Sequence, residues 1–281
     1  WTFRPDKNAE RLQASARRMV LPELPTEDFL ESLRVLVEAD EAWVPAFGDG
    51  EKSLYLRPFM FGSQAFIGLK PVNEATYMVI ASPAASIFNG GPKPITLWVA
   101  EQYARAGAGG TGAAKCGGNY AASLAAADEA AEHGCGQVIW LDGAEHRWVE
   151  ECGTMNIMFV TAAGELVTPA LTGTILDGVT RDSILTLAPE HGLRPVERRI
   201  AIDEVFDGVA DGTITEVFAC GTAAVVTPVV GFAAPGINGA GDRRFTVGDG
   251  TPGAISQAVR AHLLDIQYGR VDDTHGWLRR V

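Results

Sequence analysis

Near the start of the chain, residues 8–22 and 26–40 carry apolar side chains three or four positions apart. This spacing predicts two helices, each with one buried face, and Pro22 is expected to end the first. Two further stretches, 53–62 and 76–83, are dominated by β-branched, aromatic and other apolar residues and predict strands. The first part of the chain therefore combines helices with strands.

Residues 84–95 are rich in glycine, proline and small side chains, which predicts a linker. Beyond it, apolar runs predict strands at 95–105, 137–143, 147–162, 165–170, 198–204 and 216–232. Helical spacing is expected at 119–134, 180–191 and 253–268. Because strands and helices do not alternate strictly, the pattern favours an α+β fold over a doubly wound sheet. We expect a small domain over 1–83, the linker, and a large domain over 96–281.

Composition excludes several classes of function. A formal net charge of −12 argues against nucleic acid as a partner, since phosphates demand a basic surface. No apolar run approaches the ~20 residues that span a bilayer, so no membrane partner is expected. Four cysteines and five histidines are scattered without metal-like spacing, which predicts reduced thiols, a cytoplasmic location and no metal site. The opening "WTFRP" reads as the end of a strand, so we expect further residues upstream.

One lysine, Lys115, lies in the glycine-rich stretch "GGTGAAKCGGNYAASL", residues 109–124, just before an expected helix. A lysine among such small residues is open to close approach by another molecule. In a dry site its amine could attack a carbonyl group and form a Schiff base. The alternative is a surface lysine in a glycine loop, and these residues alone do not decide between the two.

Two glycine-threonine segments are candidates for binding phosphate. "LDGVTRDSIL" places Gly178, Val179 and Thr180 at the start of an expected helix, where free backbone N–H groups attract anions. "ACGTAAVVTPV" forms a second such turn between apolar runs. Arg4 adds a planar cation suited to phosphate. The alternatives are an ordinary helix cap, an ordinary bend and a solvated arginine.

Two adjacent acids, Glu150 and Glu151, fall within an expected strand. Neighbouring side chains on a strand point to opposite faces, so we expect one carboxylate in water and the other inside. A buried acid needs a positive partner, which would be either an arginine elsewhere or a protonated ring nitrogen of a bound molecule.

Tyr55 and Arg57 are two residues apart on another expected strand and should share one face. An exposed pair is the default interpretation. On the wall of a cleft they would offer a phenol and a cation to a dicarboxylate.

A Schiff-base lysine, a phosphate cradle and an inward carboxylate together match what pyridoxal 5′-phosphate requires. The sequence also resembles the branched-chain amino acid aminotransferases, which are fold type IV pyridoxal-phosphate enzymes, and among them the actinobacterial members. The resemblance covers essentially the whole chain and rests on five motifs: "GGTGAAKCGGNYAASL", "VEECGTMNIMF", "LDGVTRDSIL", "CGTAAVVTPV" and "DDTHGWLRRV".

The resemblance implies a small N-terminal α/β domain, expected to be incomplete here, and a larger C-terminal domain with a barrel-like sheet. It implies transamination of leucine, isoleucine and valine with 2-oxoglutarate by a cytoplasmic homodimer. Lys115 matches the Schiff-base lysine, Tyr120 the partner of the cofactor's phenolic oxygen, and Glu151 the acid at the pyridine nitrogen, with Glu150 left outside. The residues that match phosphate ligands are Arg4, Val179, Thr180 and Thr222.

On the substrate side, Thr222 and Ala223 match the turn that binds the α-carboxylate. Tyr55 and Arg57 match a pair that lets one pocket accept an aliphatic side chain and the distal carboxylate of glutamate. Ile87 stands where the family usually has a tyrosine over the substrate, which would alter specificity. Ala224 and Thr227 replace the CxxC of the mammalian members, so no redox switch of that type is expected.

Three alternatives remain open at this stage. The first is another type IV activity, either a D-amino acid aminotransferase or an aminodeoxychorismate lyase. The second is a truncated, non-catalytic homologue that keeps the fold. The third is a phosphate-binding module without pyridoxal chemistry.

Overall fold

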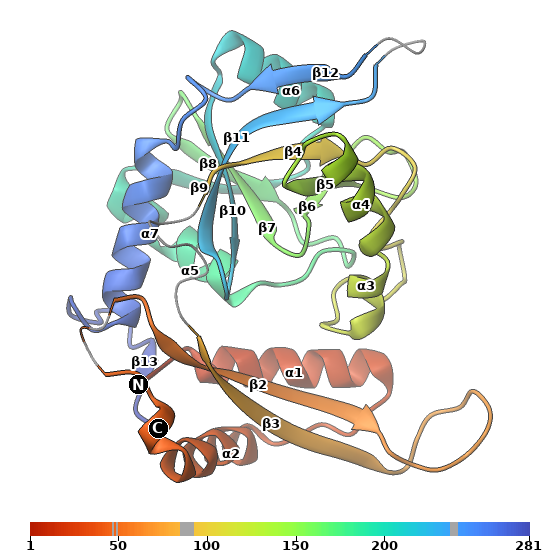
Figure 1. Ribbon diagram of the computed structural model, residues 1–281, viewed down its shortest axis with the longest axis vertical. Coiled ribbons are helices and arrows are strands. Elements are labelled where there is room, and N and C mark those ends of the chain that lie inside the picture. Colours follow the sequence, from red (N-terminus) through yellow and green to blue (C-terminus); the bar gives the residue numbers. More distant parts are fainter. Residues whose placement is uncertain (47, 49, 85–92, 237–240) are drawn as a thin grey trace. The chain divides into compact units, whose positions relative to one another are not determined.

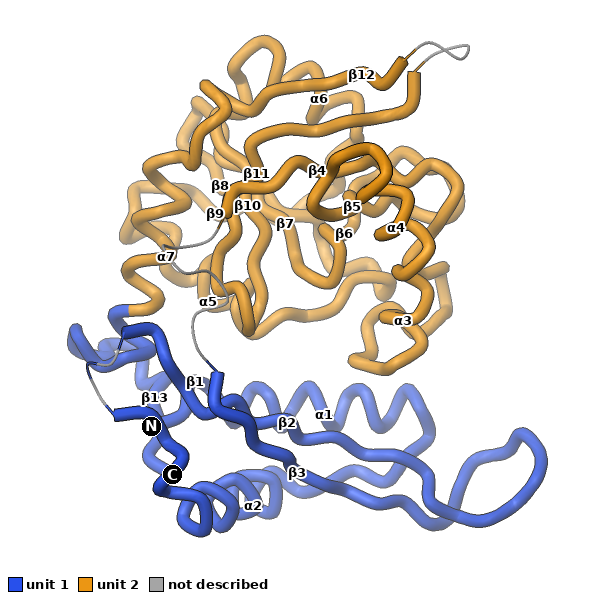
Figure 2. The backbone as a smooth tube through the Cα atoms, in the orientation of Figure 1, with its two compact units in different colours: residues 1–91, 265–281 blue, residues 92–264 orange. Residues whose placement is uncertain are grey.

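The computed structural model describes residues 1–46, 48, 50–84, 93–236 and 241–281. It divides into two compact units, shown in different colours in Figure 2: residues 1–91 with 265–281, and residues 92–264. The C-terminal residues 265–281 thus group with the first unit, whereas the predicted division assigns them to the large domain. Most of the expected linker, residues 85–92, lies outside the described residues, and this part includes Ile87. The predicted division stays a prediction.

The first unit packs two helices against a hairpin. Its core comprises Ala9, Phe29 and Leu33, against which Leu56 and Val79 of the hairpin pack. A short strand pair, in which Thr2 faces Arg279, joins the beginning of this chain to its end. The elements of the first unit are β1 (Thr2–Phe3), α1 (Pro5–Met19), α2 (Thr26–Ala39), η1 (Glu41–Trp43), β2 (Ser53–Gly62), β3 (Ala75–Ala84) and β13 (Leu278–Arg279).

The second unit is built on a mixed, curved nine-stranded sheet (Figure 1). The strands follow the order β6-β5-β4-β11-β10-β7-β8-β9, with β12 paired to β11. They are β4 (Ile95–Val99), β5 (Gln137–Leu141), β6 (Val149–Cys152), β7 (Asn156–Thr161), β8 (Glu165–Pro169), β9 (Arg194–Arg198), β10 (Ile214–Gly221), β11 (Val225–Ala234) and β12 (Arg243–Thr246). The helices that accompany this sheet are α3 (Gly117–Ala121), α4 (Leu124–Glu132), α5 (Val179–Leu187), η2 (Ala188–His191), α6 (Ile202–Asp211) and α7 (Ala254–Gln267).

Alternation along β4 explains how both faces of this sheet are covered. Leu97 and Val99 join a large core in which α6 contributes Val205 and Phe206. Trp98, which points to the other face, packs with Ala126 and Ala130 of α4. Among the described residues, no helix is long and apolar enough to cross a membrane.

One predicted strand is wrong. Residues 198–204 were expected to be extended, but β9 ends at Arg198 and α6 begins at Ile202. Asp203 and Glu204 lie in the first turn of α6, where acids favour a helix. The buried residues Ile202, Val205, Phe206 and Val209 recur at helical spacing, and the first of them lies within the predicted strand.

Candidate active site

The loop that carries Lys115 is held by a buried asparagine. Asn119, at the start of α3, donates hydrogen bonds from Nδ2 to the carbonyl oxygens of Thr111 (2.9 Å) and Ala114 (2.8 Å). Its Oδ1 lies 2.8 Å from the hydroxyl of Thr111. These contacts fix the backbone on the N-terminal side of Lys115, whose side chain is exposed. The Nζ of Lys115 lies 2.9 Å from the hydroxyl of Tyr120, five residues further on.

Both adjacent acids are buried, which overturns the expectation that one faces water. Glu150 is 5% exposed and Glu151 2% exposed. Both carboxyl groups receive a hydrogen bond from the segment before α5. Thr174 in that segment donates from its hydroxyl to Oε1 of Glu150, and the backbone N–H of Leu176 donates to Oε1 of Glu151 (2.6 Å). Thus the carboxyl group that was placed outside is also inside the protein.

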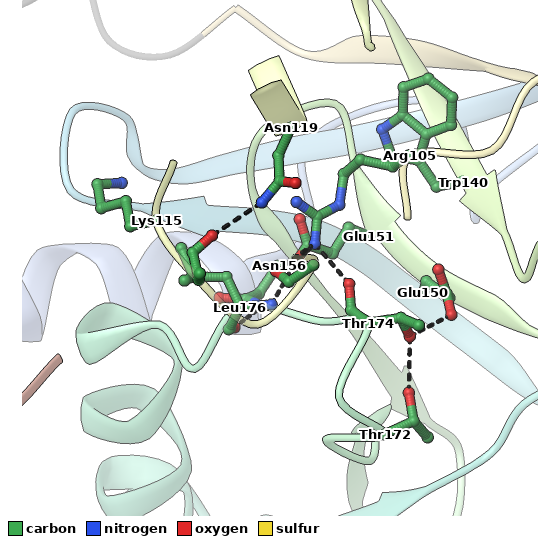
Figure 3. A network of polar contacts seen from close by, with 12 residues as sticks. Arg105, Lys115, Asn119, Trp140, Glu150, Glu151, Asn156, Thr172, Thr174 and Leu176 are labelled. Carbon is green, nitrogen blue, oxygen red and sulfur yellow. Dashed lines mark hydrogen bonds and ion pairs between the residues drawn. The ribbon is translucent and has the colours of Figure 1, made fainter. Parts of the chain in front are cut away.

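The buried acid Glu151 has an arginine partner, one of the two that its burial predicted. Nη2 of Arg105 lies 3.0 Å from Oε1 of Glu151, and both side chains are buried. Figure 3 shows this guanidinium between Glu151 and the segment that carries Thr174. Both contacts of the carboxyl group fall on Oε1, and no described residue donates a hydrogen bond to Oε2.

Burial has the largest effect on the pKa of the Glu151 carboxyl group. Loss of water raises the pKa of its carboxyl group to about 7, against the opposing effects of the Arg105 charge and the Leu176 N–H. The neighbouring Glu150 adds to the increase. Burial likewise raises the pKa of Glu150. Near neutral pH, Glu151 is therefore poised between its charged and neutral forms.

A pocket collects several of these side chains. It is partly open to solvent and is lined by Arg105, Ala114, Lys115, Asn119, Tyr120, Glu151, Thr154 and Leu176. Three predicted site residues, Lys115, Tyr120 and Glu151, thus line the same pocket. A nucleophilic amine, a phenol and a carboxylate around one space can hold an aromatic aldehyde that carries a basic ring nitrogen.

Helix α5 begins close along the chain to the pocket residue Leu176. Asn156 donates from Nδ2 to the carbonyl oxygen of Leu176 (3.0 Å), which anchors the approach to the helix. Gly178 is the N-cap, and Val179 and Thr180 form the buried first turn, as predicted. A Cβ at Gly178 would lie 2.1 Å from Oδ1 of Asn156, so the close approach requires glycine. The free N–H groups of this turn suit an anion.

The predicted turn at Thr222 and Ala223 joins β10 to β11, and both residues are exposed. Val225, which follows the turn, has a φ of 58°. This left-handed conformation is strained for a β-branched residue. The roles of Thr222 and Ala223 as binding residues stay predictions.

Three predicted site residues belong to the first unit. Arg4 is the N-cap of α1 and is 6% exposed, with its guanidinium 5.0 Å from the ring centre of Trp277. Tyr55 and Arg57 lie on β2, and the guanidinium of Arg57 lies 5.3 Å from the centre of the Tyr55 ring. This contact confirms that Tyr55 and Arg57 share one face of their strand. Their binding roles, and that of Arg4, stay predictions.

Sequence reasoning missed Arg105, Asn119 and Thr154 as pocket residues. An arginine was one of the two partners expected for the buried acid, but no spacing rule identifies which arginine it is. Asn119 carried a readable signal, because a polar residue between a glycine loop and a helix often holds the loop backbone. Among the described residues, no three or more His, Cys, Asp or Glu side chains are grouped to hold a metal ion.

Comparison with known families agrees with the resemblance inferred from the motifs. The model of the class IV amino-transferases matches residues 2–232. The chain belongs to the class IV aminotransferases. This aminotransferase is 53% identical, over 100% of its length and 75% of the relative's length, to a branched-chain-amino-acid aminotransferase of Mycolicibacterium smegmatis.

Solved structures resemble this aminotransferase over nearly its whole length. A branched-chain amino acid aminotransferase from Escherichia coli has a TM-score of 0.81 and 27% identity, covering 99% of this chain and 84% of that chain. The T.th. branched-chain amino acid aminotransferase, complexed with N-(5′-phosphopyridoxyl)-L-glutamate, has a TM-score of 0.80 and 27% identity, covering 99% and 83%. The predicted family and α+β fold class are confirmed.

Proposed function

We propose that this aminotransferase transfers the amino group of leucine, isoleucine or valine to 2-oxoglutarate, forming glutamate, with pyridoxal 5′-phosphate as its cofactor. The observation that carries the proposal is the 53% identity, over the whole chain, to a relative named for branched-chain amino acids. One of the similar structures is complexed with a phosphopyridoxyl derivative of glutamate, which supports both the cofactor and the amino acceptor.

The donor set of the pocket fits this cofactor. Glu151 offers Oε2, to which no described residue donates, to a protonated ring nitrogen. The amine of Lys115 and the hydroxyl of Tyr120 lie 2.9 Å apart and would face the aldehyde and the neighbouring phenolic oxygen. The first turn of α5, with Thr180, offers N–H groups and a hydroxyl to the phosphate. Arg4 and Thr222 are the further proposed phosphate ligands.

When bound, pyridoxal phosphate supplies an electron-withdrawing ring that stabilises negative charge on the substrate's α-carbon. Lys115 would hold the cofactor through Nζ, and its amine, once released, would take a proton from the substrate's α-carbon onto Nζ as general base. Tyr120 steadies Nζ through its hydroxyl. Glu151 keeps a proton on the ring nitrogen, because a buried cation favours the carboxylate form of its partner.

The proposed substrate contacts follow the same logic. The backbone N–H groups at Thr222 and Ala223 bind the α-carboxylate of either substrate. Arg57 binds the distal carboxylate of 2-oxoglutarate, and the Tyr55 ring, which contacts Arg57, offers an apolar surface to an aliphatic side chain. One cation beside one aromatic ring would let this face of β2 accept both classes of substrate side chain.

The active form is proposed to be a cytoplasmic homodimer. Sedimentation of the purified protein at several concentrations tests the dimer, and a monomer that retains full activity would contradict it. Fractionation of cells that produce the protein tests the location.

The deciding experiment compares the wild type with Lys115→Ala. The wild type should bind pyridoxal phosphate with visible absorption and convert L-leucine and 2-oxoglutarate to glutamate, whereas the variant should lose turnover. Lys7→Ala, which changes an exposed lysine on α1, is the control and should remain active. Turnover of D-alanine or aminodeoxychorismate in place of L-leucine would replace the proposal with another activity of this fold. Normal turnover by Lys115→Ala would refute it.

A further inference from the structure

Arg105 is a buried cation, 8% exposed, in the loop that follows β4. Its Nη2 lies within hydrogen-bond distance of three oxygens: Gly112 O (3.1 Å), Glu151 Oε1 (3.0 Å) and Thr174 O (2.6 Å). The acceptors come from the loop that carries Lys115, from β6, and from the segment that leads to α5. A single guanidinium nitrogen therefore connects three separate parts of the pocket wall.

These contacts constrain Glu151 in a specific way. Arg105 and the N–H of Leu176 both bind Oε1, so the carboxyl group is held by one oxygen and its Oε2 has no described donor. An arginine cannot lose its charge in a protein, so its burial requires an acceptor set of this kind. Removing the guanidinium would free the carboxyl group to rotate and would separate it from the lysine loop.

A second acid lies on the other side of this contact. Glu150 accepts a hydrogen bond from the hydroxyl of Thr174, whose carbonyl oxygen accepts from Arg105. The hydroxyl of Thr174 lies 2.8 Å from that of Thr172, as Figure 3 shows. Glu150 thus anchors the segment that Arg105 binds. The charged and titratable groups near Glu151 are Arg105, Lys115, Tyr120, Glu150, Cys152 and Cys220.

We propose that Arg105 is a positioning residue for the transamination. It donates a hydrogen bond to Oε1 of Glu151, which leaves Oε2 available to the pocket. It also links that carboxyl group to the loop of Lys115 through its contact with the carbonyl oxygen of Gly112. The proposal rests on the proposed function for its catalytic meaning. Its structural half concerns Glu151 alone and can be tested without cofactor or substrate.

The first measurement uses the cofactor-free protein. The carboxyl carbon of Glu151 is followed by NMR against pH, with Glu151→Gln identifying its signal. Arg105→Gln removes a positive charge 3.0 Å from Oε1 and should raise the pKa of Glu151 by about one to three pH units. Arg105→Lys keeps the charge and should give a smaller increase. An unchanged pKa in Arg105→Gln overturns the proposal.

A matched control separates this effect from the general loss of a buried arginine. Arg181 is 3% exposed and donates to the carbonyl oxygen of Pro169 (3.0 Å) and to Glu197. Arg181→Gln should lower stability, as Arg105→Gln does, but should leave the titration of Glu151 in place. An equal change in both variants would make the contact of Arg105 merely structural.

The second measurement adds pyridoxal phosphate and substrates. Arg105→Gln should bind the cofactor at least tenfold more weakly and lower kcat more than it raises the KM for leucine, because Arg105 acts through Glu151, which would hold the cofactor and not the substrate. Arg105→Lys should restore part of the cofactor affinity. Unchanged kcat and affinity in a folded Arg105→Gln would overturn the positioning role. If the wild type has no transaminase activity but Arg105→Gln still raises the pKa of Glu151, the proposed function is refuted while the positioning of Glu151 by Arg105 is upheld.

Discussion

The titration of Glu151 gives a sharp test of the site through protein stability. The perturbation is Glu151→Gln in the cofactor-free protein. Glutamine has the shape of the protonated acid and keeps an oxygen for the N–H of Leu176, so the variant differs mainly in that it cannot ionise. Any pH-dependent difference between the two proteins therefore reports this carboxyl group.

The expected change in the free energy of unfolding follows from the difference between the pKa of Glu151 in the folded protein and its pKa in the unfolded chain. Burial raises the pKa of Glu151 from its ordinary 4.5 to about 7, so the folded protein holds the proton more tightly than the unfolded chain does. As the pH rises from 4.5 to about 7, the unfolded chain ionises first and is favoured. The difference of about 2.5 pH units, at about 1.4 kcal/mol for each, predicts that the wild type loses about 3 kcal/mol relative to Glu151→Gln.

Urea unfolding between pH 4.5 and 8, followed by tryptophan fluorescence, measures this difference. Trp140 is a suitable reporter because it is fully buried and its Nε1 donates to the carbonyl oxygen of Gly153 (2.8 Å). Glu132→Gln, which changes an exposed acid on α4, is the control and should show no such trend. A wild type that gains stability relative to Glu151→Gln as the pH rises would mean that the charge of Arg105 outweighs burial, and it would refute the reasoning.

Three further predictions concern the loop before β6, the start of α5 and the pocket. Asp142 accepts hydrogen bonds from four backbone N–H groups of residues 144–148, and although burial acts to raise its pKa, these bonds lower the pKa to about 2. Asp142→Ala should therefore cost about 2 kcal/mol at neutral pH, and this cost should shrink as the pH falls from 3.8 towards 2, measured by urea unfolding. Gly178→Ala should displace Asn156 and weaken pyridoxal phosphate binding at least threefold in fluorescence titrations, whereas Gly107→Ala, which meets no atom within 4 Å, should not. Tyr120→Phe removes the hydroxyl beside the lysine amine and should lower kcat about tenfold, and an unchanged kcat would exclude Tyr120 from the proton transfer.

Most of the elements were predictable because their patterns are local. Strand β2 has the predicted bounds, Ser53–Gly62, because its continuous run of aromatic and other apolar residues is itself the local signal of a strand. The predicted strand over 198–204 failed because a short apolar run can extend as a strand or begin a helix, and only its packing partners decide. The order of strands in the large sheet joins residues far apart in the chain, and no local pattern encodes it.

The candidate site was predictable where a motif carries its own chemistry. Lys115 and Tyr120 lie five residues apart and their side chains meet across one turn, so their contact follows from the local sequence. Arg105 reaches Glu151 across 46 positions, and the sequence offers many other arginines for that role. The burial of Glu150 was missed because alternation along a strand describes its two faces but not what covers them.

The pairing of Thr2 and Phe3 with Leu278 and Arg279 has a consequence for the order of folding. The larger unit is one continuous segment, residues 92–264, whereas the smaller unit combines residues 1–91 with residues 265–281. Closing the β1–β13 pair across an unfolded segment costs more conformational entropy than closing it across a folded unit. During refolding, the amide hydrogens of residues 92–264 should therefore gain protection from exchange before those of the β1–β13 pair.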